Sequence, residues 1–339
     1  MAARNPTPPP PPPPAAGAAR PNRPARGIAC ILIAMLAIGV NDSGIKALSG
    51  DYALHQIIFI RSVIGVAISL VLLQREGGFA ALRTDRPFAH LARGLMIVAA
   101  NLLFFTALAV MPLAQTTALF FVSPLIITLL SVPLLGERLG PWRLGAVGVG
   151  FLGMLVILGP EIVGGGGYGW VALLPVLSAL GYAGMQIMTR RLGVAAPAAA
   201  MAIYVQATFV IVSLLFFAVA GDGRFVQSVS SDSWRFVLRA WAWPQTGDLT
   251  LFVLLGLASG TIGYCLSEAY RVAEAAVIAP FEYALLPIAI ATGWLVFGEV
   301  PAPRVYLGIT LIAGAGLVVF VRERQRALPA HARPPVRHG

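Results

Sequence analysis

The sequence predicts an all-α integral membrane protein of ten transmembrane helices, arranged as two inverted five-helix repeats. Three observations lead to this fold class: a mean hydropathy of +0.82, only 11% charged residues, and ten apolar stretches of membrane-spanning length. Soluble proteins carry about 25% charged residues, whereas a helix needs about 20 apolar residues to cross a bilayer. The stretches also lack the two-residue alternation of barrel strands.

The ten spans account for most of the chain. We expect them at 27–47, 55–73, 91–110, 113–135, 142–159, 169–188, 199–220, 249–270, 275–297 and 304–321. The predicted organisation is a disordered Pro-rich tail (1–25), a first repeat (26–160), a second repeat (169–321) and a basic tail (322–339). The first tail holds seven consecutive prolines, at 8–14, which favour an extended polyproline conformation and cannot join a helix.

The distribution of basic residues predicts the orientation in the membrane. If the N-terminus is cytoplasmic, eighteen of the 24 basic residues fall on that side and four on the other. Lys and Arg near helix ends favour the cytoplasmic face, so both termini are expected there in a multi-pass protein of the cell inner membrane. The net charge of +10 is thus explained by topology, and we expect no nucleic-acid partner. We expect a monomer or weak dimer.

An internal repeat is visible in the second part of each half. Residues 123–160 are similar to residues 286–320: a proline opens an apolar half-helix, a Gly-Glu pair ends it, and a Gly-rich span follows. The pairs are Gly136-Glu137 and Gly298-Glu299. Each unit contains five spans, an odd number, so the second copy enters the membrane from the opposite side. Inverted repeats are typical of secondary transporters, which alternate between two open states around one midplane site.

These residues resemble the EamA family of the drug/metabolite transporter superfamily. The stretch 269–319 is similar to the family signature almost throughout, and the resemblance covers about 27–321. It implies ten helices, a central cavity between the halves, and movement of small metabolites without ATP hydrolysis. The Asn41-Asp42 pair is similar to the branch with bacterial riboflavin and S-adenosylmethionine carriers. The segment 221–248 is longer than the family's usual connection.

Ionisable residues inside spans are costly and mark candidate functional sites. Asp42 and Lys46 lie four residues apart on one helix face. Counting from the turn near residue 51 places Asp42, nine residues before it, and Arg61, ten residues after it, at nearly the same depth. The sequence therefore predicts an Asp42–Arg61 pair with Lys46 nearer the surface. Whether this cluster contacts substrate or only holds two helices together is left open by the residues.

Glu282 is the second candidate, about seven residues inside the ninth span and without a basic neighbour in the sequence. Pro280 and Pro287 flank it, which predicts a bent or opened helix whose backbone groups face a cavity. We expect Glu282 to contact a cationic or hydrogen-bonding part of the substrate or to carry a coupling proton. The alternative is a protonated structural glutamate. Glu268 and Arg271 are expected to form a local surface pair.

The candidate substrate-binding residues combine these charged groups with uncharged polar residues of the spans. The full set is Asn41, Asp42, Lys46, Arg61, Asn101, Gln186, Gln206, Tyr264, Glu282 and Tyr283. We expect no catalytic residues, because the sequence offers no acid, histidine and nucleophile that converge. We also expect no metal site and no cofactor, since the two cysteines both fall in spans. Proton coupling is the one co-substrate that the buried carboxylates suggest.

Two further motifs have simple structural explanations. The spacing GxGxxG at 148–153 lies inside a span and not after a strand, so we interpret Ala146 and Gly150 as close helix-packing positions, with Thr310 and Gly314 as their second-copy equivalents. The segment 221–248 holds three tryptophans and two arginines at 234–244, which favours an interfacial helix over a substrate gate.

The sequence thus predicts a secondary active transporter that moves a small organic metabolite by alternating access. The solute is expected to be amino-acid-like or heteroaromatic, such as a vitamin or nucleoside-type compound. A membrane-embedded enzyme acting on lipid-linked substrates is the alternative, and a receptor or scaffold has no need of two inverted copies.

Overall fold

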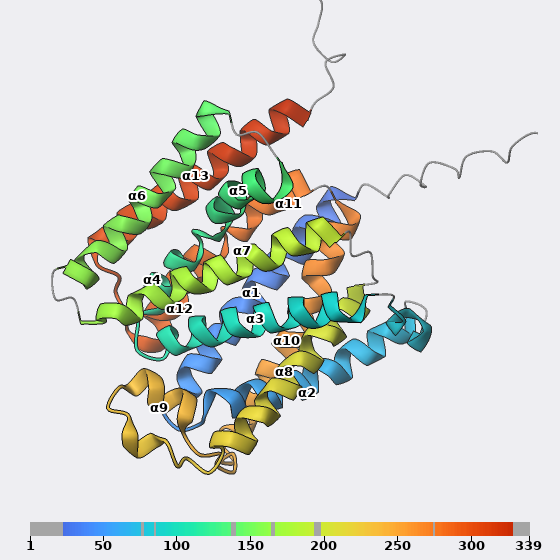
Figure 1. Cartoon of the computed structure of the whole chain (residues 1–339), viewed down its shortest axis with the longest axis vertical. Helices are drawn as coiled ribbons and strands as arrows, with labels where there is room; N and C mark the ends of the chain where they lie inside the picture. The colour runs from blue at the N-terminus through green and yellow to red at the C-terminus, as the bar shows by residue number, and fades with distance from the viewer. Residues whose placement is uncertain are drawn as a thin grey trace, which may run out of the picture.

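The protein is a bundle of long helices, and the computed structural model describes residues 23–75, 78–84, 86–136, 140–163, 167–192, 198–273 and 275–327 (Figure 1). Within these described ranges, ten helical spans are long and apolar enough to cross a membrane, in agreement with the predicted number. Most of the predicted N-terminal tail lies outside the described residues. The last helix continues to Ala327, past the predicted end of the tenth span at 321.

The helices of the first half are α1 (Pro24–Leu48), α2 (Leu54–Arg75), α3 (Pro87–Leu108), α4 (Leu113–Phe120), α5 (Ser123–Leu135) and α6 (Pro141–Val163), with the short η1 (Gly78–Leu82). Those of the second half are α7 (Leu174–Leu192), α8 (Ala198–Ala220), α9 (Asp232–Leu238), α10 (Leu249–Val272), α11 (Ala275–Glu282), α12 (Leu285–Phe297) and α13 (Pro303–Ala327), with η2 (Gly169–Leu173) and η3 (Val226–Ser228).

Proline and glycine set many of the helix ends. Proline opens α1, α3, α6 and α13, where its missing N–H would have no partner in any case. Gly136 and Gly298 end α5 and α12 with φ of 72° and 68°, a left-handed conformation that glycine adopts without steric cost. The glycine of each repeated Gly-Glu pair is therefore a helix terminator, at matching places in the two halves.

Two spans are broken at matching places. The fourth span consists of α4 and α5, interrupted at Phe121–Val122, and the ninth consists of α11 and α12, interrupted at Tyr283–Ala284. Pro124 and Pro287 follow these breaks closely, and proline removes one backbone donor from each second half-helix. The prediction of an opened helix beside Glu282 is confirmed, and the fourth span shares the feature.

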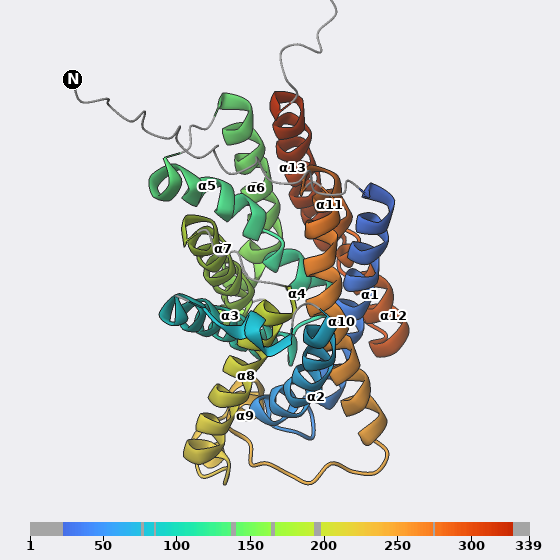
Figure 2. The ribbon, with the colours of Figure 1, turned by 90° about the vertical axis from the view of Figure 1, so that its right-hand side faces the viewer.

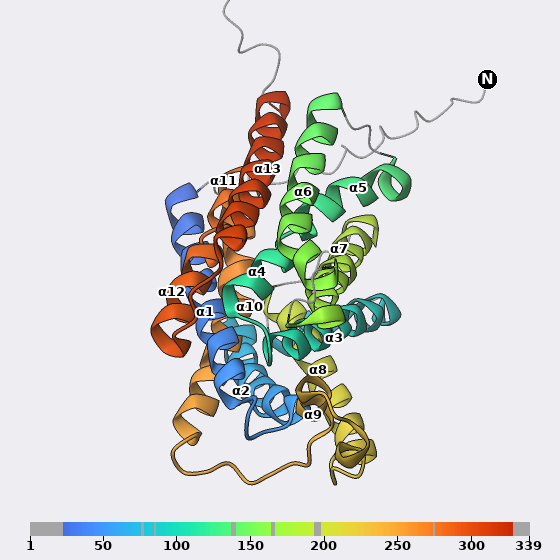
Figure 3. The same cartoon turned by 90° about the vertical axis from the view of Figure 1, so that its left-hand side faces the viewer.

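The main helix pairs have the same pattern in the two halves of the chain. α1 packs on α10 and α3 packs on α7, α2 packs on α8, and α6 packs on α13 (Figures 2 and 3). If each span of the first half is exchanged for the span at the same place in the second half, the same four pairs result. These pairings support two equivalent halves. We call the side where α1 begins and α13 ends the terminal face, and the side where α1 ends the far face.

The contact of α6 with α13 depends on glycine. A Cβ added at Gly153 would lie 2.8 Å from Leu311 Cβ and 2.9 Å from the Gly308 carbonyl oxygen, so the two backbones approach closely. Gly150 is crowded by Leu125, as its predicted packing role requires. The prediction that Gly314 is the equivalent packing position is wrong, because nothing lies within 4 Å of a Cβ atom added there. Gly308 takes that role, because it faces α6.

The segment 221–248 folds over the turn between α1 and α2 at the far face. Tyr52 donates to Asp248 (2.6 Å) and accepts from the backbone N–H of Gln245 (2.8 Å), while the Gln56 side chain bonds both backbone groups of Ala242. The predicted helix over the tryptophans is only partly correct. α9 contains Trp234, whereas Trp241 and Trp243 follow it in non-helical chain.

Candidate functional site

The ends of the broken helices meet in the middle of the bundle. Phe120 and Phe121 lie at the end of α4, and Glu282 and Tyr283 lie at the end of α11. The rings of Phe121 and Tyr283, one from each half, are 5.4 Å apart between centroids. The ends of discontinuous helices near the middle of the membrane are a common place for the substrate site of a transporter.

Tyr182 of α7 is the centre of the polar groups near these ends. Its ring lies 5.5 Å from that of Phe120, and its hydroxyl accepts a hydrogen bond from the Gln186 amide (3.1 Å). Tyr182 also interacts electrostatically with Glu282 and with Arg93 of α3. We call this group the central cluster and define it by its members: Arg93, Phe120, Tyr182, Gln186, Glu282 and Tyr283.

All members of the central cluster are partly exposed, although they lie within membrane-spanning helices. A partly exposed polar side chain among apolar helices indicates space that a ligand or water can reach. The cluster offers ring faces for stacking, a carboxylate, a guanidinium group and an amide. That combination suits a flat solute with hydrogen-bonding edges.

Of the predicted site residues, the central cluster contains Gln186, Glu282 and Tyr283. Glu282 interacts electrostatically with Tyr182 and Tyr283, so it is less isolated than its sequence neighbours suggested. Arg93 and Tyr182 were not predicted. The charge count placed Arg93 among the cytoplasmic basic residues, although residue 93 falls within the predicted third span (91–110). Its position inside that span was the sequence signal that could have identified it as a site residue.

Asn41, Asp42 and Arg61 form a separate buried network between α1 and α2. Arg61 donates to the Asn41 side-chain oxygen (2.6 Å), and the Asn41 amide donates to Asp42 (3.0 Å). The predicted direct contact between Asp42 and Arg61 is therefore corrected: Asn41 lies between the two charges. Arg61 also packs between the rings of Phe105 and Phe209, at 5.5 and 5.4 Å from their centroids.

These three side chains are each no more than 5% exposed. Arg61 and Asp42 each bond Asn41, and this buried arrangement favours the helix-holding interpretation over direct substrate contact. Asp42 and Arg61 also attract each other across the amide.

Lys46 has a partner that the sequence did not predict. Its ammonium group lies 2.6 Å from Glu299, which follows α12, and donates to the carbonyl oxygen of Met111. Glu299 in turn accepts from the backbone N–H of Leu113 at the start of α4 (2.8 Å). Lys46 thus connects the two halves at the far face.

The remaining predicted residues have local roles in the structure. Asn101 donates to the Ile97 carbonyl of its own helix (3.0 Å), and buried Gln206 donates to Ser259 (2.7 Å) between α8 and α10. Tyr264 packs partly exposed against the main apolar core. Their part in substrate binding stays a prediction.

Glu268 differs from its predicted place in a surface pair. Its side chain is 1% exposed and lies 2.9 Å from Arg26 of α1, so it connects the halves at the terminal face. The side chain of its predicted partner Arg271 lies outside the described residues. α10 packs along α1, and this contact buries the carboxylate.

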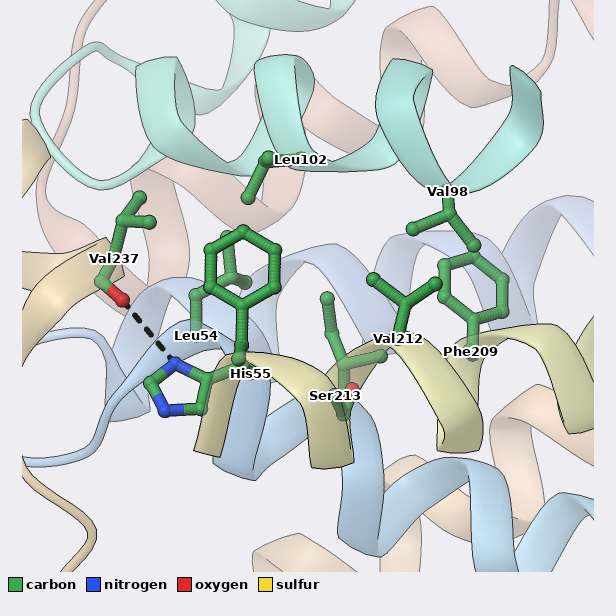
Figure 4. A pocket seen from close by; sticks show the side chains of 10 residues that line it. Leu54, His55, Val98, Leu102, Phe209, Val212, Ser213 and Val237 are labelled. Carbon is green, nitrogen blue, oxygen red and sulfur yellow. Dashed lines mark hydrogen bonds between the residues drawn. The ribbon is translucent and has the colours of Figure 1, made fainter. Parts of the chain in front are cut away.

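A small groove with a cavity volume of about 20 Å³ lies between α2, α3, α8 and α9, apart from the central cluster (Figure 4). Its lining is apolar except for His55 and Ser213, and the His55 ring is turned to the Val237 carbonyl, 3.2 Å away. So apolar a groove offers little to a polar metabolite. Among the described residues, no three His, Cys, Asp or Glu side chains gather as a metal site.

Comparison with known proteins identifies the family. Residues 25–159 match the model of the EamA-like transporter family. A riboflavin transporter of Rhizobium johnstonii is 35% identical over 76% of this chain and 78% of its own length. An S-adenosylmethionine uptake transporter of Rickettsia prowazekii is 24% identical over 90% and 96%.

A crystal structure with a TM-score of 0.59 and 20% identity covers 88% of this chain and 99% of its own, which supports the fold alone. The predicted resemblance is confirmed by the family match and by relatives of nearly the full length. The chain forms a ten-span helical bundle with broken fourth and ninth spans, and it matches transporters of small metabolites along most of its length. It belongs to the EamA-like transporter family of the drug/metabolite transporter superfamily, whose members move small metabolites across membranes.

Proposed function

We propose that this protein transports riboflavin, or a flat heteroaromatic metabolite of similar size, and binds it at the central cluster. The observation that carries the proposal is the position of Tyr182. Its ring stands beside Phe120, its hydroxyl bonds Gln186, and it interacts electrostatically with Glu282 and Arg93. An isoalloxazine-type ring system has two faces for stacking and an edge of donors and acceptors for such groups. The 35% identity to a riboflavin transporter supports this choice.

The mechanism we propose is alternating access of two inverted halves, as a secondary carrier in the inner membrane with the terminal face in the cytoplasm. The matching breaks in the fourth and ninth spans and the exchangeable helix pairings support it. The excess of basic residues on the terminal side supports the orientation. We propose Glu282 as the group that carries a coupling proton, and we expect no enzymatic activity.

S-adenosylmethionine is the second candidate substrate. Relatives named for its uptake match 90% of this chain, and Glu282 supplies a carboxylate for a sulfonium cation. Competition separates the two solutes. Excess S-adenosylmethionine is expected to leave riboflavin transport unchanged if the flat ring system is what the cluster recognises.

The test is transport of riboflavin, followed by its fluorescence, in vesicles that carry the purified protein with and without a proton gradient. Tyr182→Phe removes one hydrogen-bonding hydroxyl and is expected to raise KM about 3–10-fold. Tyr204→Phe is the matched control, because the Tyr204 hydroxyl bonds the Leu82 carbonyl away from the central cluster. Transport of neither riboflavin nor S-adenosylmethionine, or equal effects of both substitutions, contradicts the proposal.

A further inference from the structure

The half-helix α4 is held at its far-face end by two carboxylates. Glu299 accepts from the Leu113 backbone N–H (2.8 Å), the first of α4, and Glu161 accepts from the side chain of Gln115, two residues later (3.3 Å). The N-terminus of a helix has unbonded N–H groups and a partial positive charge, so Glu299 stabilises α4 as a capping anion. α4 is too short, at 8 residues, to be stable without such contacts.

Each of the two carboxylates is also paired with a cation. Lys46 lies 2.6 Å from Glu299, and Arg304 lies 2.7 Å from Glu161. Both pairs cross between the halves: Lys46 and Glu161 belong to the first, Glu299 and Arg304 to the second. We call Lys46, Glu161, Glu299 and Arg304 the far-face clamp.

The clamp is well shielded from solvent where it grips α4. The Lys46 side chain is 10% exposed, that of Glu299 21% and that of Glu161 1%, although Arg304 is 41% exposed. Lys46 also lies over the Phe297 ring, 5.4 Å from its centroid. Shielded, hydrogen-bonded charges of this kind interact more strongly than surface pairs.

The other end of α4 reaches the central cluster. Phe120, seven residues after Leu113 and thus about 10 Å along the helix, stands beside Tyr182, and the next residue, Phe121, meets Tyr283 across the two halves. A movement of α4 at the clamp therefore moves the rings that contact the proposed substrate. This short, stiff element joins the far face to the site.

We propose that the far-face clamp is the gate that closes the far face. In the closed state Glu299 and Glu161 position α4, and separation of Lys46 from Glu299 opens a path from the far face to the central cluster. The inference rests on the proposed alternating access. Glu299 and Glu161 act through α4 and are positioning residues, not substrate contacts. The carrier opens this face by breaking contacts between the halves that the clamp supplies.

The test measures access from each face to a cysteine on α4. The reporter is Thr117→Cys, at a position 1% exposed, in a protein whose two natural cysteines are replaced (Cys30→Ala, Cys265→Ala). A membrane-impermeant maleimide is applied to one face of reconstituted vesicles at a time. Lys46→Gln and Glu299→Gln are each expected to raise labelling from the far face about tenfold, the equivalent of about 1.4 kcal/mol, with no rise from the terminal face.

Asp222→Asn is the matched control, because it removes an exposed far-face ion pair with Arg224 (3.2 Å) that involves neither α4 nor a residue of the clamp. Unchanged labelling in both clamp variants, an equal rise from both faces, or an equal rise in the control overturns the proposal. If Lys46→Gln does not fold, Glu161→Gln tests the second half of the clamp in the same way. Labelling needs no substrate, so a failure to transport riboflavin would leave this result standing.

Discussion

The close crossing of α6 and α13 allows a quantitative prediction for Gly308→Ala. The added methyl group would lie 2.6 Å from the Ile157 Cδ1 atom and 2.8 Å from the Gly153 carbonyl oxygen. Favourable contacts between carbon atoms begin at about 3.5 Å. The isoleucine side chain can turn away, but the carbonyl belongs to the backbone of α6, so the two helices must separate.

Two opposing contributions set the magnitude. Overpacking in a close-packed contact costs about 1–3 kcal/mol, whereas replacing a helical glycine with alanine stabilises by about 0.5–1 kcal/mol. The middle of the two ranges gives a net loss of about 1 kcal/mol. For a chain of 339 residues, that lowers the unfolding temperature by roughly 1–2 °C.

A thiol-reactive fluorogenic dye provides the assay, since Cys30 and Cys265 both lie in spans and are partly or fully shielded until the bundle unfolds. Gly148→Ala is the matched control. It adds the same methyl group to α6 at a position with nothing within 4 Å, so it should leave stability unchanged or slightly higher. Equal unfolding temperatures for the two variants would refute the close-contact reasoning.

Three further predictions follow from the polar contacts. Asp42→Asn leaves the Arg61 charge buried without its counter-charge, so we expect a loss of about 3–5 kcal/mol, seen as poor yield of monodisperse protein. Glu282→Gln should fold normally but lose the response of transport to a proton gradient; full, pH-dependent transport by this variant would contradict its assignment. The hydrogen bond to Asp248 raises the pKa of Tyr52 above its ordinary value of 10.0, so the folded state favours the neutral phenol. The stabilising contribution of Tyr52 is therefore present below about pH 10 and is lost as the pH rises further. Limited proteolysis of segment 221–248 at increasing pH measures this loss, and the Tyr52→Phe variant should not show it.

Composition and local pattern explain why the spans were predictable. A bilayer requires about 20 apolar residues for each crossing whatever their neighbours are, so hydropathy alone located ten helices. The repeated Gly-Glu pairs were visible for an equally local reason: Gly136 and Gly298 end their half-helices in a left-handed conformation. The break beside Glu282 followed from flanking prolines.

The pairing of side chains was predicted less well, because it depends on how helices from the two halves pack. Depth along the chain placed Arg61 correctly near Asp42, but not the Asn41 amide between them. Lys46 and Glu299 are 253 positions apart, and no sequence periodicity connects them. Gly314 was predicted at the contact that Gly308 makes, because the sequence does not say which face of α13 meets α6.

The sequence by itself determined the membrane environment, the number of spans, the repeat and the family, since each depends on residue types along one stretch of chain. Only the tertiary structure decided which polar groups gather at the central cluster and which are occupied in holding helices together. Arg93 and Tyr182 join Glu282 there because α3 packs on α7 and the broken ends of α4 and α11 meet across the two halves. Such contacts arise from packing between distant segments, which local sequence pattern does not encode.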